Sequence, residues 1–362
     1  MALSSCSLTS QESGPVPALQ ADEVLSAVET AAQATSQAGE PAVQATSQPT
    51  EAAIEPSSTP LPGGFCQPDA LAAGFWITGY LPEYQPVNQE MGNCLTDLIF
   101  FSLEPTSNGH LDASRLSGER LDELHAIQTR YGLRLHLSLG GWGRNGGFGP
   151  MVIDPVLRQG FVLELSNFLQ QNGFNGVDFD WEFPESDGEV SGYGSLIKET
   201  VEALSAWGGQ VTVTFYPYEN LDLEPFLSAD RIHIMSYDRG SQHATYEQAE
   251  ADIKLFLQLG APPEKLVLGI PFYGREMSEP YTAYTYAQIV DQYKPEPGQD
   301  EAGGVYFNGI ETVQLKTCLA RQQGLGGVMI WEIGQDVQPG SGLEQYSLLQ
   351  AINAALKDGC SP

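Results

Sequence analysis

The sequence predicts an α/β fold, a closed (β/α)8 barrel (TIM barrel), preceded by a disordered N-terminal leader. Two observations support the barrel. From Gly74 onward, short apolar segments rich in β-branched and aromatic residues alternate with segments of helical periodicity. The apolar segments number eight, and the chain of 362 residues is long enough for the roughly 250 residues that such a barrel needs.

The eight apolar segments have the length and composition of buried strands. They comprise residues 75–81, 95–103, 133–139, 176–183, 210–216, 231–237, 265–273 and 326–333. Helical segments between them favour a parallel sheet, because parallel strands need long crossover connections. An open doubly wound sheet is the structural alternative. It would normally carry a glycine-rich nucleotide loop after its first strand, and "GYLPEYQP" (residues 79–86) has no such pattern.

Residues with capping preferences mark the helical segments. Asp154 and Pro155 are typical of an N-cap and a first helical position, and Gly173 is typical of the residue that ends a helix. Thr245 and Gln248 have the spacing of a capping box. Helices are therefore expected after the third and the sixth strands.

The first 63 residues differ in composition from the rest of the chain. They consist mainly of Ala, Gln, Ser, Thr, Glu and Pro and contain the near-repeat "QATSQAGEP" and "QATSQPTE". So few large apolar side chains cannot offset the entropy of ordering the segment. We therefore predict a flexible leader or tether over residues 1–63 and the barrel domain over residues 64–362.

The start of the chain bears on its location. "LSSC" (residues 3–6) resembles the end of a bacterial lipoprotein signal, in which the Cys becomes lipidated. Only five residues precede Cys6, too few for a complete signal, so either translation starts further upstream or the resemblance is chance. A polar tether behind a lipid anchor would suit a protein held at the cell surface. We expect an extracellular or cell-envelope-anchored location.

The charge balance excludes some partners. The formal net charge is −30, with 16 Lys and Arg against 46 Asp and Glu. Nucleic acid and anionic membrane surfaces require a concentrated basic patch, so neither is an expected partner. No apolar run approaches the roughly 18 residues that a transmembrane segment needs. We expect a monomer that uses no cofactor.

Four cysteines follow Cys6: Cys66, Cys94, Cys318 and Cys360. An even number permits two disulfides, and buried free thiols are the alternative. Since Cys66 and Cys360 flank the folded region, a bridge between them could tie its ends together. The sequence does not determine the pairing.

Three carboxyl groups stand at every second position of "FNGVDFDWEFP" (residues 174–184). Because side chains alternate along a strand, Asp178, Asp180 and Glu182 must point to one face. The apolar Val177 and Trp181 point to the other face, where helices cover the barrel. The acids therefore point into the barrel.

Three ionised acids in a barrel interior would repel one another, so protons must be shared and at least one pKa raised. Glu182 lies nearest the C-terminal end of the strand, where the active sites of such barrels lie, with Asp180 one layer below. A raised pKa is what a general acid needs near neutrality. The structural alternative, acids paired with buried Lys or Arg, has few candidate partners in this chain.

The same segment resembles the fourth-strand signature DGxDxDWE of glycoside hydrolase family 18, the chitinases and their relatives. This chain has "NGVDFDWE", in which Asn175 replaces the first Asp. Four other segments resemble family motifs: "SLGGWG" (138–143), "MSYD" (235–238), "GIPFYGR" (269–275) and "VMIWEIGQD" (328–336). The resemblance extends over most of residues 74–357.

The resemblance implies roles for the acids. Glu182 would protonate the glycosidic oxygen, and Asp180 would orient the acetamido group of the substrate, whose carbonyl oxygen attacks the anomeric carbon. Asp178 would lie behind Asp180 and share a proton with it. The implied substrate is chitin or another β-1,4-linked N-acetylglucosamine oligosaccharide, cleaved with retention of configuration.

Further residues acquire roles from the same motifs. Tyr237 and Asp238 would hold the N-acetyl group, and Trp331 would stack beneath the sugar. The remaining residues expected in the substrate pocket are Tyr80, Ser138, Met235 and Arg275. Trp142 follows a glycine-rich segment near the expected rim, and we expect its ring to contact sugar.

The residues themselves favour the same chemistry. Most glycosidases place two carboxylates on opposite sides of the bond, but acids on one strand lie on one side only, which favours a nucleophile supplied by the substrate. The five histidines lack metal-ligand spacing, so no metal is expected. "GGWGRNGGFG" (residues 140–149) lacks the Lys-Ser/Thr of a phosphate loop.

The sequence allows two other functions. An endo-β-N-acetylglucosaminidase acting on glycoproteins or peptidoglycan would share every catalytic residue. A chitinase-like sugar-binding protein would keep the barrel and lose the acid. Only about 35 residues (276–310) occupy the place of the family's α+β insertion, so the domain is expected to lack a large insertion. We expect an open, shallow cleft and endo action or short oligomers as substrates.

Overall fold

The computed structural model describes residues 74–217 and 222–360 of the chain. The predicted leader, residues 1–63, lies outside the described residues, as does Cys6. All the elements named below belong to the described part.

Eight parallel strands form a closed barrel, which confirms the predicted fold. Their order around the barrel is β1-β13-β8-β7-β6-β5-β4-β2, and pairing of β1 with β2 closes it. The strands are β1 (Trp76–Pro82), β2 (Asp97–Pro105), β4 (Arg134–Gly140), β5 (Gly176–Asp180), β6 (Gln210–Phe215), β7 (Arg231–Ile234), β8 (Leu266–Pro271) and β13 (Gly327–Trp331). Each lies within one predicted segment or extends it by one or two residues.

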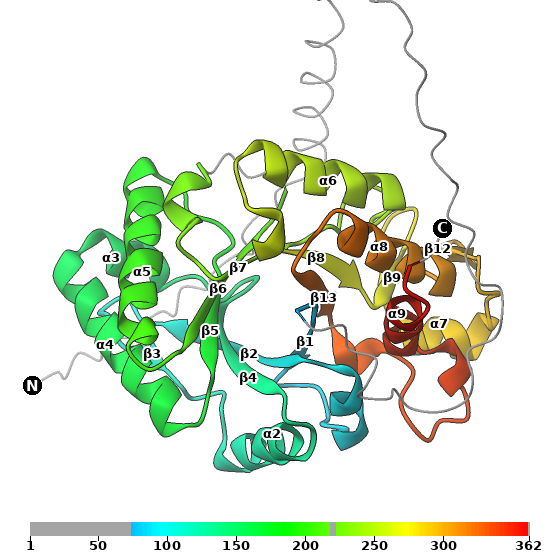
Figure 1. Ribbon diagram of the computed structural model, residues 1–362, viewed down its shortest axis with the longest axis horizontal. Coiled ribbons are helices and arrows are strands. Elements are labelled where there is room, and N and C mark those ends of the chain that lie inside the picture. Colours follow the sequence, from blue (N-terminus) through cyan, green and yellow to red (C-terminus); the bar gives the residue numbers. More distant parts are fainter. Residues whose placement is uncertain (1–73, 218–221, 361–362) are drawn as a thin grey trace, which may run out of the picture. The chain divides into compact units, whose positions relative to one another are not determined.

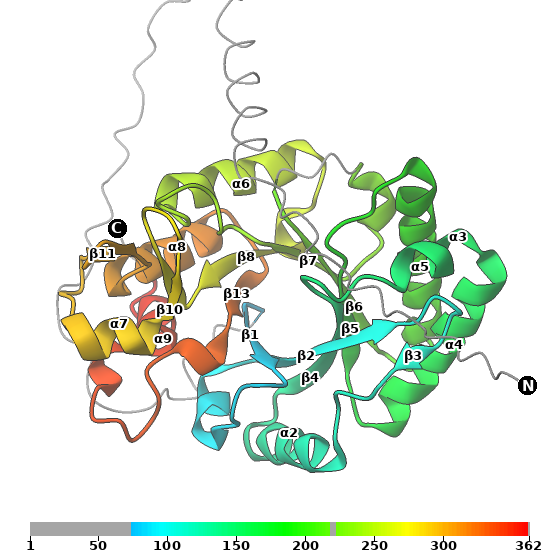
Figure 2. The same ribbon diagram turned by 180° about the vertical axis from the view of Figure 1, so that it is seen from behind.

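Helices surround the strands, as Figures 1 and 2 show from opposite sides. The α-helices are α2 (Gly118–Tyr131), α3 (Phe148–Ile153), α4 (Pro155–Gln171), α5 (Asp187–Ser205), α6 (Tyr246–Gln258), α7 (Tyr286–Tyr293), α8 (Ile310–Gln322) and α9 (Leu348–Lys357). Short 3-10 helices are η2 (Gln89–Cys94), η3 (Glu224–Phe226), η4 (Pro263–Lys265), η5 (Ile333–Gln335) and η6 (Glu344–Tyr346).

The predicted helix starts are confirmed. The Asp154 side chain accepts hydrogen bonds from the backbone N–H groups of Val156 and Leu157 at the start of α4. Thr245 and Gln248 form the expected capping box at the start of α6. These caps satisfy N–H groups that have no partner within the helix.

A second, antiparallel sheet follows β8. It has the order β10-β9-β12-β11 and contains β9 (Tyr273–Glu276), β10 (Ala283–Thr285), β11 (Glu301–Ala302) and β12 (Val305–Tyr306), with α7 between β10 and β11. The short strand β3 (Leu111–Asp112) pairs with the end of β2. The segment between β8 and α8 is therefore short but folded, and even its loop-like part, residues 294–304, contains β11.

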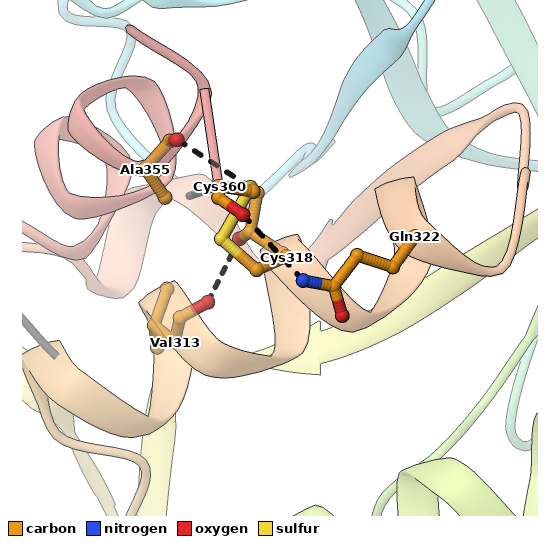
Figure 3. Close-up of a disulfide and its surroundings, with 6 residues drawn as sticks. Val313, Cys318, Gln322, Ala355 and Cys360 are labelled. Carbon is orange, nitrogen blue, oxygen red and sulfur yellow. Dashed lines mark hydrogen bonds between the residues drawn. A yellow bond between two sulfur atoms is a disulfide. The ribbon is translucent and has the colours of Figure 1, made fainter. Parts of the chain in front are cut away.

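A disulfide joins α8 to the residues that follow α9 (Figure 3). It connects Cys318 and Cys360, whose Cα atoms are 5.2 Å apart. A bridge from Cys66 to Cys360 is therefore wrong, because α9 returns the end of the chain to α8. Cys94 is also disulfide-bonded, and Cys66 lies outside the described residues.

An ion cluster occupies the N-terminal end of the barrel. Asp97 Oδ1 lies 3.0 Å from Arg231 Nη1 and 3.0 Å from His136 Nε2, and Asp97 Oδ2 lies 2.8 Å from Arg134 Nη2. The Arg231 guanidinium lies 3.9 Å from the centroid of the Trp76 ring. Although burial opposes ionisation, the hydrogen bond from His136 and the charges of the two arginines hold the pKa of Asp97 well below its usual range.

We predict that Asp97→Ala lowers the free energy of unfolding by about 3–5 kcal/mol, because it leaves the buried Arg231 without its counter-ion. Urea denaturation at pH 7 measures this loss. Glu90→Ala is the control, since Glu90 pairs with Arg130 on the surface and such pairs contribute at most about 1 kcal/mol. Equal losses in the two variants would contradict a stabilising role for the cluster.

Candidate active site

Asp178 and Asp180 of β5 lie inside the barrel as the alternation predicts, and Glu182 follows them just beyond the C-terminal end of the strand. Asp178 is fully buried, Asp180 is 4% exposed, and Glu182, two residues beyond the strand, is partly exposed. On the opposite face, Trp181 stacks on Phe148 of α3, with the ring centroids 5.0 Å apart. The apolar residues therefore anchor the strand to the helices, and the acids point to the C-terminal end of the barrel.

The loop after β4 holds the backbone at Glu182. Asn145 Nδ2 donates to the Glu182 carbonyl oxygen at 2.8 Å, and the Glu182 N–H donates to Asn145 Oδ1 at 3.3 Å. Gly141 N–H donates to the Asp180 carbonyl oxygen at 2.6 Å. Gly140 has a φ of +100°, and a Cβ there would lie 2.3 Å from that same oxygen. Glycine is therefore required where this loop contacts β5.

The Glu182 carboxyl group is largely enclosed. Burial, followed by the negative charge of Asp238, raises the pKa of Glu182 to about 7, while a hydrogen bond from the Trp142 N–H acts in the opposite direction. The Trp142 side chain is 79% exposed. The glycine-rich loop thus contributes a backbone donor to Glu182 and an exposed aromatic ring at the rim.

Asp178 accepts hydrogen bonds from three hydroxyl groups. Tyr80 Oη and Ser138 Oγ each lie 2.9 Å from Oδ2, and Thr214 Oγ1 lies 2.9 Å from Oδ1. Burial raises the pKa of Asp178, and the three hydrogen bonds oppose that rise. Tyr80 and Ser138, predicted pocket residues, are themselves buried and contact Asp178.

Asp238 is the centre of a second polar cluster, just beyond β7. Arg275 forms a two-pronged ion pair with it, with Nε 2.6 Å from Oδ1 and Nη2 3.0 Å from Oδ2. Tyr273 Oη donates to Oδ1 at 2.7 Å. The neighbouring Tyr237 is buried, and burial together with the charge of Asp180 raises its pKa well above the usual value. The structure thus brings the β7 motif and the β8 motif together.

Aromatic rings line the barrel beside the acids. The Trp331 ring lies edge-on to Phe101 and Tyr80, with centroid separations of 4.6 Å and 5.6 Å. Met235 and Tyr237 belong to the same apolar cluster. Trp331 is partly exposed, whereas Met235 is buried, so Trp331 has the more accessible surface of the two.

Some residues at the site were not predicted from the sequence. Thr214 donates to Asp178, Asn145 holds the backbone at Glu182, Phe101 packs on Trp331, and His233 contacts Tyr80. The alternation of side chains along β2, β6 and β7 indicates that Phe101, Thr214 and His233 point into the barrel. Asn145 lies in a loop, where no such pattern exists. An inward position alone does not identify a site residue, because many inward side chains only fill the barrel.

The described residues contain neither a cluster of metal-binding side chains nor a helix that could cross a membrane. No group of three or more His, Cys, Asp or Glu side chains in residues 74–217 and 222–360 could hold a metal ion. None of the helices in that part of the chain has the length and apolar character needed to cross a membrane.

Comparison with known proteins identifies the family. The model of glycosyl hydrolases family 18 matches residues 77–336. Mouse chitotriosidase-1 is 28% identical over 331 residues, which cover 71% of this chain and 71% of the mouse protein. A probable chitinase 2 of Drosophila melanogaster is 27% identical, over 68% of this chain and 69% of the fly protein.

Solved structures have the same fold. The family 18 chitinase ChiB from the chitin utilization locus of Flavobacterium johnsoniae superposes with a TM-score of 0.68 at 27% identity, covering 79% of this chain and 95% of that one. A chitinase from Bacteroides thetaiotaomicron gives a TM-score of 0.71 at 22% identity, over 79% and 97% of the two chains. The chain belongs to glycosyl hydrolases family 18 and is a glycoside hydrolase that resembles the chitinases.

Proposed function

We propose that this chain hydrolyses β-1,4-linked N-acetylglucosamine polymers and oligomers, such as chitin, by a retaining, substrate-assisted mechanism. Glu182 acts as the general acid and then as the general base. The observation that carries the proposal is the position of Glu182, a mostly buried carboxyl group with a pKa of about 7, two residues beyond the end of the strand that contains Asp180 and Asp178. The names of its relatives, chitotriosidase and chitinase, favour this substrate class.

In the first step Glu182 gives its proton to the glycosidic oxygen, and the bond from that oxygen to the anomeric carbon breaks. Burial and the nearby charge of Asp238 keep Glu182 protonated near neutrality. The Trp142 N–H and the Asn145 side chain fix the orientation of the residue. A positioned acid of this kind typically accelerates such reactions by about 10²- to 10⁴-fold.

The nucleophile comes from the substrate. Asp178 and Asp180 of β5 and Glu182 just beyond it lie on one side of the bond, so no second carboxylate of this segment reaches the opposite face. The carbonyl oxygen of the acetamido group attacks the anomeric carbon, and Asp180 orients that group and balances the developing positive charge. Water then opens the cyclic intermediate while Glu182 accepts its proton, and configuration is retained.

The remaining residues hold the sugar. Tyr237 and Asp238 bind the acetamido group, and Arg275 keeps Asp238 in place through its two-pronged ion pair. Trp331 forms the floor beneath the sugar in the cleaved position. Trp142 offers an exposed ring for a neighbouring sugar, since aromatic faces pack well against the apolar faces of pyranoses.

Tyr80, Ser138 and Met235 complete the pocket from below. The first two donate hydrogen bonds to Asp178 and so act on the acetamido group through Asp178 and Asp180. Met235 packs in the apolar cluster beside Tyr237. We also propose an exported enzyme, because a structural disulfide such as Cys318–Cys360 persists in oxidising compartments.

Glu182→Gln should lower kcat on chitooligosaccharides by about 10²- to 10⁴-fold, because the amide has no proton to donate. Binding of the oligomers, measured by calorimetry, should remain nearly unchanged. Glu185→Gln is the matched control, an exposed carboxyl group three residues away. Wild-type turnover in Glu182→Gln would remove the assignment.

The pH profile should reflect the pKa of Glu182. Since the acid must be protonated, kcat/KM should fall as the pH rises through about 7. Asp238→Asn removes a nearby negative charge, so the pKa of Glu182 should fall and the alkaline limb should move down by about one pH unit. Glu119→Gln, an exposed change on α2, should leave the limb in place. A limb that stays in place or moves upward in Asp238→Asn would contradict the cause assigned here.

A substrate panel distinguishes the related activities. The full chain should release products fastest from chitin oligomers, compared with high-mannose glycopeptides and peptidoglycan at equal concentrations of N-acetylglucosamine. Mass spectrometry of the products measures the rates. Faster cleavage of the glycopeptide or of peptidoglycan would replace the proposed substrate, and binding of oligomers without any cleavage would indicate a sugar-binding protein.

A further inference from the structure

A buried histidine lies one contact away from the candidate catalytic acids. His233 of β7 is fully buried, and its Nδ1 lies 2.8 Å from the hydroxyl oxygen of Tyr80. The same hydroxyl lies 2.9 Å from Asp178 Oδ2 and 3.0 Å from Thr214 Oγ1. One hydroxyl group therefore has three polar neighbours but only one proton to donate.

The protons around Asp178 can be counted. Ser138 and Thr214 each have one hydroxyl proton, and both are within hydrogen-bond distance of Asp178. The carboxylate is the strongest acceptor near Tyr80, so the Tyr80 proton belongs on Asp178 as well. The Tyr80 oxygen is then left as an acceptor, and an N–H on His233 Nδ1 would fill that position.

The other tautomer of His233 would compete with Asp178. With its proton on Nε2, the imidazole would present a lone pair at Nδ1 and take the single proton of Tyr80 away from the carboxylate. His233 Nε2 has no hydrogen-bond partner among the described residues, so no acceptor stabilises a proton there. A proton on Nδ1 makes a hydrogen bond and leaves those of Asp178 intact.

Burial keeps His233 neutral. Burial, followed by the positive charge of Arg231, holds the pKa of His233 well below its usual value. The titratable groups around His233 and Asp178, on their own and on the neighbouring strands, are Tyr80, Asp97, His136, Asp180, Arg231 and Tyr237. The imidazole therefore carries one N–H, and its position decides the hydrogen bonding.

We propose that His233 is a positioning residue for the reaction. As the neutral Nδ1–H tautomer it donates to Tyr80, so that the hydroxyl protons of Tyr80 and Thr214 are both directed to Asp178. This role rests on the proposed function, in which Asp178 lies behind Asp180 and shares a proton with it. His233 acts through Tyr80 and does not touch the substrate.

Loss of the His233 N–H should raise the pKa of Asp178. Without the N–H of His233, the Tyr80 oxygen loses its donor and can accept the Thr214 proton instead, which draws that proton away from Asp178. Fewer donors to a carboxylate raise its pKa, so the Asp178 and Asp180 pair binds a second proton more readily. The acid limb of kcat/KM, where the pair loses its negative charge, should move to higher pH.

Two variants of His233, assayed in the full chain with a chitooligosaccharide substrate, test the direction in which the acid limb of kcat/KM moves. His233→Leu removes the donor, and its acid limb should move up by about one pH unit, with kcat several-fold lower. In His233→Asn the amide nitrogen can occupy the position of Nδ1, so the limb should return to the wild-type pH. His136→Gln is the matched control, because His136 contacts Asp97 through Nε2 and an amide can replace that contact.

The tautomer provides a readout that needs no activity. Long-range ¹H–¹⁵N correlation spectra of the ¹⁵N-histidine-labelled chain should assign the proton of His233 to Nδ1. A proton on Nε2 would overturn the proposal, as would an unmoved acid limb in a folded His233→Leu variant or an equal shift in His136→Gln. If the wild-type chain cleaves no oligomer, the proposed function fails, and the spectrum still decides the tautomer.

Discussion

The alternation of side chains along β5 is the constraint on which the rest of the site depends. It places Asp178 and Asp180 on the inner face of the strand, with Glu182 just beyond its end, where water solvates three charges poorly. Neighbouring residues and protonation offset the free-energy cost of burying these acids. Three hydroxyl groups donate to Asp178, and Glu182 remains protonated up to about pH 7. The unfavourable placement of the acids thus raises the pKa of Glu182 into the range that the proposed general acid needs.

The barrel interior has two polar regions, which differ in whether their acids are paired with basic side chains. At the N-terminal end, Asp97 is paired with Arg231 and Arg134, an arrangement that keeps its charge satisfied. At the C-terminal end, Glu182 and Asp178 have no Lys or Arg partner among the described residues, and burial raises the pKa of both. We infer that the first region stabilises the fold, and the second holds the acids that we propose to be catalytic, at the end where barrels of this architecture place their active sites.

Much of this arrangement was predictable from the sequence because it depends on local patterns. Strand alternation placed the acids inside the barrel, and capping residues such as Asp154 located helix starts. The contacts of Thr214 and His233 were not predictable, because they depend on the register between neighbouring strands and on the closure of β1 onto β2. The suggested bridge from Cys66 to Cys360 was wrong for a similar reason, because the partner of Cys360 depends on where α9 packs.

We propose that the acids of one segment serve one side of the scissile bond, so that the acetamido group of the substrate supplies the nucleophile. The most direct test of this proposal is mass-spectrometric identification of the new reducing ends that the full chain releases from partially N-acetylated chitosan. The account predicts that nearly all of them are N-acetylglucosamine, because a free amine has no carbonyl oxygen to attack the anomeric carbon. New glucosamine ends in proportion to their share of the polymer would contradict it.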